Sequence, residues 1–137
     1  MRILGVDYGE KRIGLAVSDP LGLTAQGLQT LRWQNKKEML EAMRRVCGEY
    51  AVSESVVGLP VNMNGSMGPK AKEILELIGE IERALNLPVR TWDERLTSRE
   101  ALRLMIAADL SRKKRRKASD RMAATLILQN YLEFKRK

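Results

Sequence analysis

Two short apolar runs open the chain, at residues 3–6 and 13–17. Both runs are rich in branched side chains and too short for a helix, so each predicts a β-strand. The segment between them contains Gly9 and charged residues, which suit a solvated turn. We therefore expect a β-hairpin in which Asp7 lies at the end of a core strand, on the face that alternation also gives to Ile3 and Gly5.

The later pattern predicts alternating strands and helices. Residues 24–32 alternate loosely and could add a third strand of a meander. The expected elements that follow are a helix over 37–50, a strand over 55–58, a helix over 69–86, a strand over 87–92, a helix from Ala101 after a capping box at 97–100, and a last helix around 123–131. The charge run at 112–117 interrupts the periodicity before that last helix. This order is typical of a mixed α/β sheet with helices on its faces, whose ligands gather beyond the carboxyl ends of the strands.

Length and composition indicate one globular domain covering residues 1–137. The chain is 44% hydrophobic and 31% charged, as in ordinary globular proteins. No apolar run approaches the roughly 20 residues that span a bilayer, and no signal peptide is apparent, so we expect no membrane partner and a cytoplasmic location. Cys47 is the only cysteine, which excludes an internal disulfide, and its place in a helical pattern favours buried packing.

Charge changes this picture more than composition does. The formal net charge of +8 favours association with nucleic acid through counterion release, although many basic proteins bind none. The chain has no histidine, which removes the usual general base. Acid and base chemistry must therefore depend on carboxylates, lysines or a divalent metal ion.

Acidic residues at three separate places follow or begin apolar elements, namely Asp7, the pair Asp93 and Glu94, and Asp120. Three carboxylates without histidine form the ligand set of a hard cation such as Mg²⁺ or Mn²⁺. Simpler roles are open to each: Asp7 could accept backbone hydrogen bonds in its turn, and the pair could favour the positive end of a helix. Alternation places Asp93 and Glu94 on opposite faces, so we expect one of them to point toward Asp7, and the pattern does not choose between them.

Asp120 stands at the head of an apolar helical stripe that continues through Ala123, Ala124, Ile127 and Tyr131. An unpaired charge on the core side would be costly. Either a metal ion or a salt bridge to a neighbouring cation would remove that cost.

Two further segments could contact phosphate. Residues 65–69 offer free backbone amides at a helix start, where Lys70 could add a phosphate contact, although a plain turn is the simpler reading. The cations at 112–117 stand beside Asp120, which favours a phosphate clamp over a merely solvated loop.

These motifs carry a resemblance that covers essentially the whole chain. Residues 6–19, Val-Asp-Tyr-Gly-Glu-Lys-Arg-Ile-Gly-Leu-Ala-Val-Ser-Asp, resemble the opening motif of a family of Holliday-junction resolvases, also described as pre-16S ribosomal RNA processing nucleases, of ribonuclease H-like fold. Further motifs occur in family order at 58–60, 64–66, 68–69, 93–98 and 117–124. Met67 departs from the pattern, because that loop position is often acidic in the family.

The resemblance implies a ribonuclease H-like mixed sheet and a metal-dependent endonuclease. It implies Asp7, Glu94 and Asp120 as the catalytic and metal-binding triad for Mg²⁺ or Mn²⁺, with two ions expected. The expected nucleic-acid contacts are Lys11, Arg12, Asn64, Ser66, Arg95, Lys113, Lys114, Arg115, Arg116 and Lys117.

The expected function is cleavage at the 5′ end of precursor 16S ribosomal RNA, with a structured RNA or a ribosomal precursor particle as partner. One alternative is resolution of branched DNA junctions, which would favour a homodimer. The alternative from another class is a nucleic-acid-binding module without turnover.

Overall fold

The computed structural model describes residues 2–96 and 112–136, with side chains described for 2–96 and 122–136. The predicted capping box at 97–100 and the helix expected from Ala101 lie outside the described residues. Across the described part, no helix is long and apolar enough to cross a membrane.

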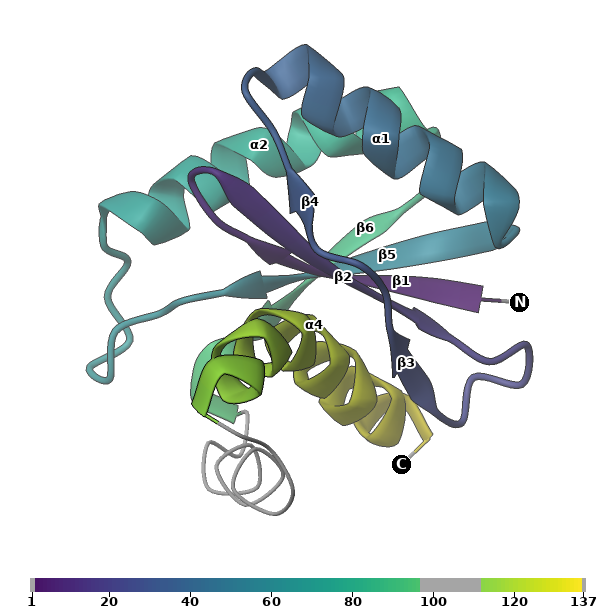
Figure 1. The fold of residues 1–137 in the computed structure, drawn as a ribbon. Helices are drawn as coiled ribbons and strands as arrows, with labels where there is room; N and C mark the ends of the chain where they lie inside the picture. Colours follow the sequence, from purple (N-terminus) through teal and green to yellow (C-terminus); the bar gives the residue numbers. More distant parts are fainter. Residues whose placement is uncertain (1, 97–111, 137) are drawn as a thin grey trace.

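A six-stranded mixed sheet forms the centre of the molecule (Figure 1). Its strand order is β3-β2-β1-β5-β6, and β4 also pairs with β2. The hairpin strands β1 and β2 are antiparallel, while β5 and β6 run parallel to β1. The strands are β1 (Arg2–Tyr8), β2 (Arg12–Ser18), β3 (Ala25–Gly27), β4 (Leu31–Arg32), β5 (Val52–Leu59) and β6 (Val89–Asp93). The predicted hairpin and mixed α/β sheet are confirmed.

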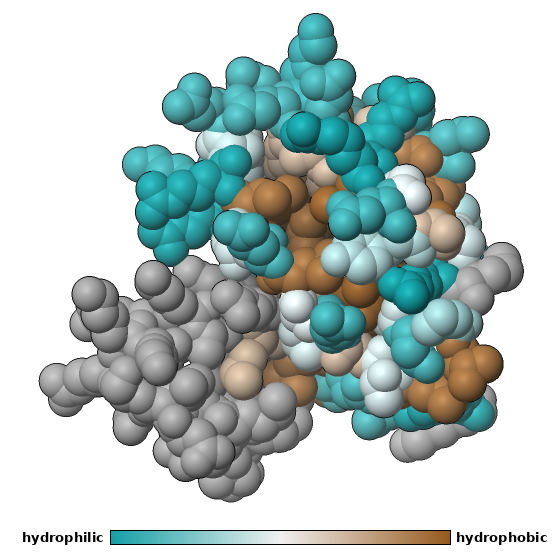
Figure 2. Space-filling view, turned by 45° about the vertical axis from the view of Figure 1, so that its right-hand side comes forward, coloured by the Kyte–Doolittle hydropathy of each residue, from teal (hydrophilic) through white to brown (hydrophobic). Residues whose placement is uncertain are grey.

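Helices cover both faces of this sheet. Figure 1 shows α1 (Lys36–Glu49) and α2 (Pro69–Leu85) together on one face and α4 (Arg112–Arg136) on the other. The side chain of Asn35 caps α1 by accepting from the Glu38 amide, and Pro69 occupies the first turn of α2. In Figure 2, hydrophilic side chains cover the upper part of the molecule, where α1 and α2 lie, and apolar side chains reach the surface at the height of the sheet.

Two predicted elements differ from the structure. Residues 24–32 form two short strands, β3 and β4, which pair with successive parts of β2 instead of forming one continuous strand. The charge run at 112–117, expected to interrupt helical structure, lies within α4. The interruption was inferred from apolar spacing alone, whereas lysine and arginine are good helix formers.

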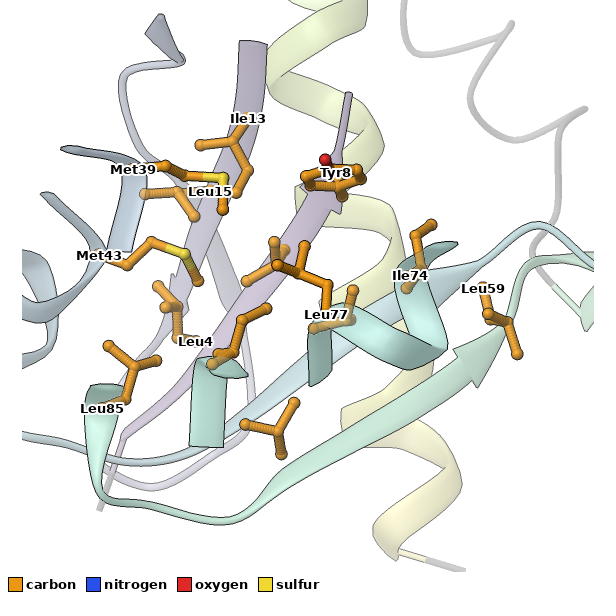
Figure 3. Close-up of a cluster of buried hydrophobic side chains, with 14 of the residues drawn as sticks. Leu4, Tyr8, Ile13, Leu15, Met39, Met43, Leu59, Ile74, Leu77 and Leu85 are labelled. Atoms are coloured by element: carbon orange, nitrogen blue, oxygen red, sulfur yellow. The ribbon is translucent and has the colours of Figure 1, made fainter. Parts of the chain in front are cut away.

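The sheet divides the apolar interior into two clusters. The larger one fills the space between the sheet and the pair α1 and α2, where Leu4, Ile13, Met39, Met43 and Ile74 are almost fully buried (Figure 3). The smaller one joins the other sheet face to α4 through residues such as Ile3, Trp92, Ala124 and Leu128. Burial on both faces explains why β1 and residues 56–59 of β5 read as continuous apolar runs instead of alternating ones.

A half-buried polar network fastens α4 to β5. Glu54 accepts hydrogen bonds from the Tyr131 hydroxyl and from Lys135 Nζ, the latter at 2.8 Å. Burial raises the pKa of the Glu54 carboxyl, but these two hydrogen bonds and the charges of Lys135 and Arg90 together hold the pKa below its ordinary 4.5. Glu54 therefore stabilises the fold above pH 4.5, and this contribution disappears as the pH falls through the lowered value.

We expect Glu54→Gln to lower the free energy of unfolding at pH 7 by roughly 1–2 kcal/mol, because it weakens charge-assisted hydrogen bonds. Urea unfolding at pH 7 and pH 3 checks this, with the exposed Glu49→Gln as control. The variant should lose less stability than the wild type between the two pH values. An identical pH dependence in both proteins would contradict the role of Glu54.

Candidate active site

Asp7 projects from β1 toward the side of the sheet that α4 covers. Ile3 belongs to the α4-side cluster, and a methyl group on Gly5 would lie 2.7 Å from Leu128 Cβ. Because alternate residues of a strand share a face, Asp7 lies on that face as well. Across the hairpin its partner is Gly14, so the adjacent position on β2 carries no side chain.

Glu94 reaches the same face from β6, two strands away. It follows the end of that strand in the short 3-10 turn Glu94–Leu96, two residues after the buried Trp92 of the α4-side cluster. A methyl group on Gly58 would lie 3.3 Å from both Cγ and Cδ of Glu94. The carboxylate arm of Glu94 therefore extends over the bare backbone of β5, the strand between β6 and β1.

Asp7 and Glu94 line one open cleft of about 740 Å³. Its other walls come from the loop after β5, from Lys70 at the start of α2 and from Arg95. The cleft thus lies beyond the carboxyl ends of β1, β5 and β6, where ligands gather in such sheets.

Asp93, the acid next to Glu94, has a different role. Its carboxylate accepts from Arg95 Nη2 at 2.7 Å, from Nε at 3.0 Å and from the Arg95 backbone amide at 2.9 Å. The hydrogen bonds from the Arg95 side chain hold the pKa of Asp93 below its ordinary value. Asp93 therefore fixes the Arg95 guanidinium at the cleft, where Nη1 also reaches the Met63 carbonyl at 3.5 Å.

The loop after β5 is organised by its own polar side chains. Asn64 Oδ1 accepts from the amide and the hydroxyl of Ser66, and Asn62 Nδ2 donates to the Ser66 hydroxyl at 3.0 Å. Gly65 has a φ of +87°, which only glycine adopts without strain. Asn64 and Ser66 thus shape this loop, while Asn62 and Met63 line the cleft. A direct contact of Asn64 or Ser66 with nucleic acid stays a prediction.

The remaining predicted residues lie on two neighbouring segments. Lys11 and Arg12 line a smaller hollow that also includes Asp7 and Lys70. Asp120 belongs to α4, on the sheet side toward which Asp7 and Glu94 point, and its side chain is outside the described ones. The side chains of Lys113, Lys114, Arg115, Arg116 and Lys117 are outside them too. Within the side chains that are described, no three Asp, Glu, His or Cys residues gather as a metal site.

The residues present fit a hard divalent cation. Asp7 and Glu94 offer only oxygen donors, which suit Mg²⁺ and Mn²⁺. Gly14 stands opposite Asp7, and Gly58 follows the Val6–Val57 pair by one residue, so neither strand places its own side chain beside Asp7. The space above Gly58 is filled by Ile127 and by the arm of Glu94. These glycines were not recognised as site residues from the sequence, although a glycine inside an apolar strand often marks a close approach of a ligand.

Gly58→Ala is expected to reduce both catalysis and stability moderately. The added methyl group would lie 2.6 Å from Ile127 Cδ1, a flexible tip, and would also displace the arm of Glu94. At 3.3 Å the Glu94 arm must move by only a few tenths of an ångström, so the rate should fall by less than the roughly 100-fold that a displacement of about 1 Å can cause. Single-turnover cleavage and thermal unfolding check this. A variant with the wild-type rate would show that Glu94 does not act from this position.

Sequence comparisons identify close relatives along almost the whole chain. The model of the family described as RuvX: Holliday junction resolvase matches residues 1–134. A protein of Clostridium botulinum is 53% identical over 133 residues, covering 97% of both chains, and one of Clostridium kluyveri is 50% identical with the same coverage. Both relatives carry the provisional name pre-16S rRNA nuclease.

Structural comparisons identify the same architecture in more distant proteins. The fold is similar to Thermus thermophilus RuvC in complex with a Holliday junction substrate, with a TM-score of 0.61 and 15% identity, covering 98% of this chain and 96% of that one. It is also similar to the fowlpox virus Holliday junction resolvase, with a TM-score of 0.56 and 17% identity, covering 98% and 99%. At these identities the likeness shows the fold alone, and it confirms the ribonuclease H-like sheet.

Proposed function

Because this chain belongs to the RuvX family of Holliday junction resolvases, we propose that it is a metal-dependent endonuclease that processes the 5′ end of precursor 16S ribosomal RNA. The observation that carries the proposal is the convergence of Asp7 and Glu94, from strands separated by β5, on one cleft beyond the carboxyl ends of β1, β5 and β6. The name of its relatives at 50–53% identity supports the RNA substrate. The proposed partner is a structured RNA or a ribosomal precursor particle in the cytoplasm.

In this proposal Asp7, Glu94 and Asp120 hold Mg²⁺ or Mn²⁺, with two ions expected. When bound, such ions activate the attacking water and stabilise negative charge on the leaving oxygen. Arg95, held in place by Asp93, orients a phosphate at one wall of the cleft, and Lys70 offers a second cation. Their fixed positions favour one alignment of the scissile phosphate against the carboxylates.

Binding of the polyanion depends on cations around the cleft. Lys11 and Arg12 extend it along the β1–β2 turn, and the net charge of +8 favours a nucleic acid over a neutral substrate. The basic segment Lys113 to Lys117 on α4 is proposed to hold phosphates beside Asp120, and Asn64 and Ser66 to present their loop to the strand.

Incubation of the purified protein with a precursor 16S transcript and with a synthetic four-way DNA junction tests the function. Each substrate is incubated with Mg²⁺, with Mn²⁺ and with EDTA. We expect metal-dependent cuts near the 5′ end of the mature sequence in the RNA and intact junction DNA. If neither the RNA nor the junction is cut in the presence of a metal ion, the nuclease proposal is wrong.

Junction resolution is the second candidate, favoured by the family's description. Symmetric cleavage of a junction requires two active sites and therefore favours a homodimer. Paired cuts in the junction by a dimeric particle, without cuts in the RNA, would support this candidate. A binding module without turnover is disfavoured, because two carboxylates in a phosphate-binding cleft weaken binding unless a cation offsets them.

A further inference from the structure

Two arginines stand directly opposite each other at one end of the sheet. In the antiparallel pairing of β2 with β4, Arg12 is the register partner of Arg32. Like charges in such a cross-strand pair destabilise a sheet. Within the described residues, Arg32 makes no ion pair. An anion bound beside Arg32 would reduce the repulsion between the two guanidinium groups, so this place suits a phosphate.

The arginine pair points to the same side of the sheet as the acidic cleft. The neighbouring register pair, Ile13 and Leu31, packs into the cluster under α1 and α2. Alternation therefore turns Arg12 and Arg32 to the opposite face, which also carries Asp7. Asp7 pairs with Gly14 on β2, and Arg12 lies two residues before Gly14 on the same strand. The arginine pair and Asp7 are therefore neighbours on one face of the sheet.

Hollows in the surface connect these two places. A hollow of about 680 Å³ is lined by both arginines, Lys11 and Trp33. A smaller one of about 310 Å³ shares Lys11 and Arg12 with it, and it shares Asp7 and Lys70 with the acidic cleft. A nucleic-acid strand bound at the acidic cleft would therefore meet two further hollows in succession along the β1–β2 turn.

Trp33 forms a fixed aromatic wall of the distal hollow. It lies on the side of the sheet that α1 and α2 cover, so the hollow extends from the arginine pair around the end of the sheet. Its indole stacks on Tyr8 with ring centroids 5.9 Å apart, and its Nε1 donates to the Gly9 carbonyl at 3.2 Å. Its backbone amide donates to the Lys11 carbonyl at 3.1 Å. An indole held in this way can stack with a nucleobase with little loss of side-chain entropy, and such stacking is tolerant of sequence.

The acidic residues of the same hollow limit what it can hold. Glu10 and Glu38 also line it, so three cations are offset by two carboxylates. This balance suits one phosphate better than a long run of phosphates. An aromatic side chain reaches the face of a base only where that base is unpaired.

We propose that this hollow is a second nucleic-acid subsite, in which Arg12 and Arg32 hold one backbone phosphate and Trp33 contacts the base of an unpaired nucleotide on the strand to be cleaved. The inference rests on the proposed function, because it takes the substrate at Asp7 and Glu94 to be a nucleic acid. It adds that the enzyme prefers a strand with single-stranded character beside the scissile bond.

Arg32→Gln tests the phosphate contact, with Arg45→Gln on the exposed surface of α1 as a matched control of equal charge. The probe is an RNA hairpin with single-stranded extensions at both ends, bound in Ca²⁺ over a series of salt concentrations. We expect Arg32→Gln to bind about tenfold more weakly and to reduce the slope of log affinity against log salt by about one. Equal binding by the two variants would overturn the subsite.

Tryptophan emission tests the base contact independently of cleavage. The chain has two tryptophans, and Trp92→Phe leaves Trp33 as the only one. We expect the extended hairpin to quench this emission and a blunt hairpin to leave it unchanged. Binding of the extended hairpin without quenching would overturn the base contact, and circular dichroism verifies the fold of each variant.

The two proposals fail in different ways. Absence of metal-dependent cleavage by the wild type, with quenching and the Arg32 effect retained, would contradict the nuclease function and leave the subsite standing. Normal cleavage with equal binding by Arg32→Gln and Arg45→Gln would contradict the subsite alone.

Discussion

Asp7→Asn is expected to reduce the rate of phosphodiester cleavage by about 100- to 10,000-fold, because divalent-ion chemistry supplies several kcal/mol of transition-state stabilisation. Asp7 lines the acidic cleft from the end of β1 and lies between two glycine positions on the neighbouring strands. The asparagine has nearly the same size and removes the charge that would hold a cation. The fold should therefore be retained, and the loss should be confined to catalysis.

Single-turnover cleavage at saturating Mg²⁺ measures this effect, and binding of the same RNA in EDTA provides the comparison. We expect the binding affinity of Asp7→Asn to equal or exceed that of the wild type, because a negative charge near phosphate has been removed. Glu76→Gln, an exposed carboxylate on α2, is the matched control and should cleave normally. Equal rates for Asp7→Asn and the wild type would exclude Asp7 from the reaction.

Gly5→Ala should produce the largest loss of stability among the substitutions considered. Its methyl group would lie 2.7 Å from Leu128 Cβ and 3.1 Å from the Ala124 carbonyl, and both atoms are part of or adjacent to the backbone of α4. The helix must therefore shift, which costs roughly 1–3 kcal/mol as in other overpacked cores. Since α4 also carries Asp120, the cleavage rate of the molecules that remain folded should decrease as well.

Urea unfolding compares this variant with Gly48→Ala. Gly48 lies near the end of α1, and a methyl group there would meet no atom within 4 Å. Alanine is the better helix former, so Gly48→Ala should be neutral or stabilising by up to about 1 kcal/mol. Similar midpoints for the two variants would contradict the close packing of β1 against α4.

The hairpin and the position of Asp7 could be predicted because local patterns determine them. Two branched apolar runs around a glycine-containing turn form β1 and β2, and alternation correctly assigned Asp7 to the face of Ile3 and Gly5. The same rule separated Asp93 from Glu94, but it could not decide which of them shares a face with Asp7. That depends on the position of α4, which packs on Trp92 and so identifies the face of Glu94.

Other features depend on contacts between distant segments. The pairing of Asp93 with Arg95 was not anticipated, although the two residues are close in sequence, because the geometry of the turn after β6 brings the guanidinium back to the carboxylate. The pairing of Arg12 with Arg32 depends on the division of residues 24–32 into two strands along β2. Residues 112–117 are helical although they lack the apolar spacing of a helix. To predict this, the high helix propensity of lysine and arginine has to be given more weight than that spacing.

The position of a divalent ion is the most direct test of the central claim. Fe²⁺ replaces Mg²⁺ in the wild-type protein, ascorbate and peroxide generate radicals at the bound iron, and mass spectrometry locates the breaks in the polypeptide. We predict breaks beside Asp7, Glu94 and Asp120, suppressed by excess Mg²⁺ and lost in Asp7→Asn. Breaks confined to other parts of the chain, or unchanged in Asp7→Asn, would contradict a metal-dependent active site in this cleft.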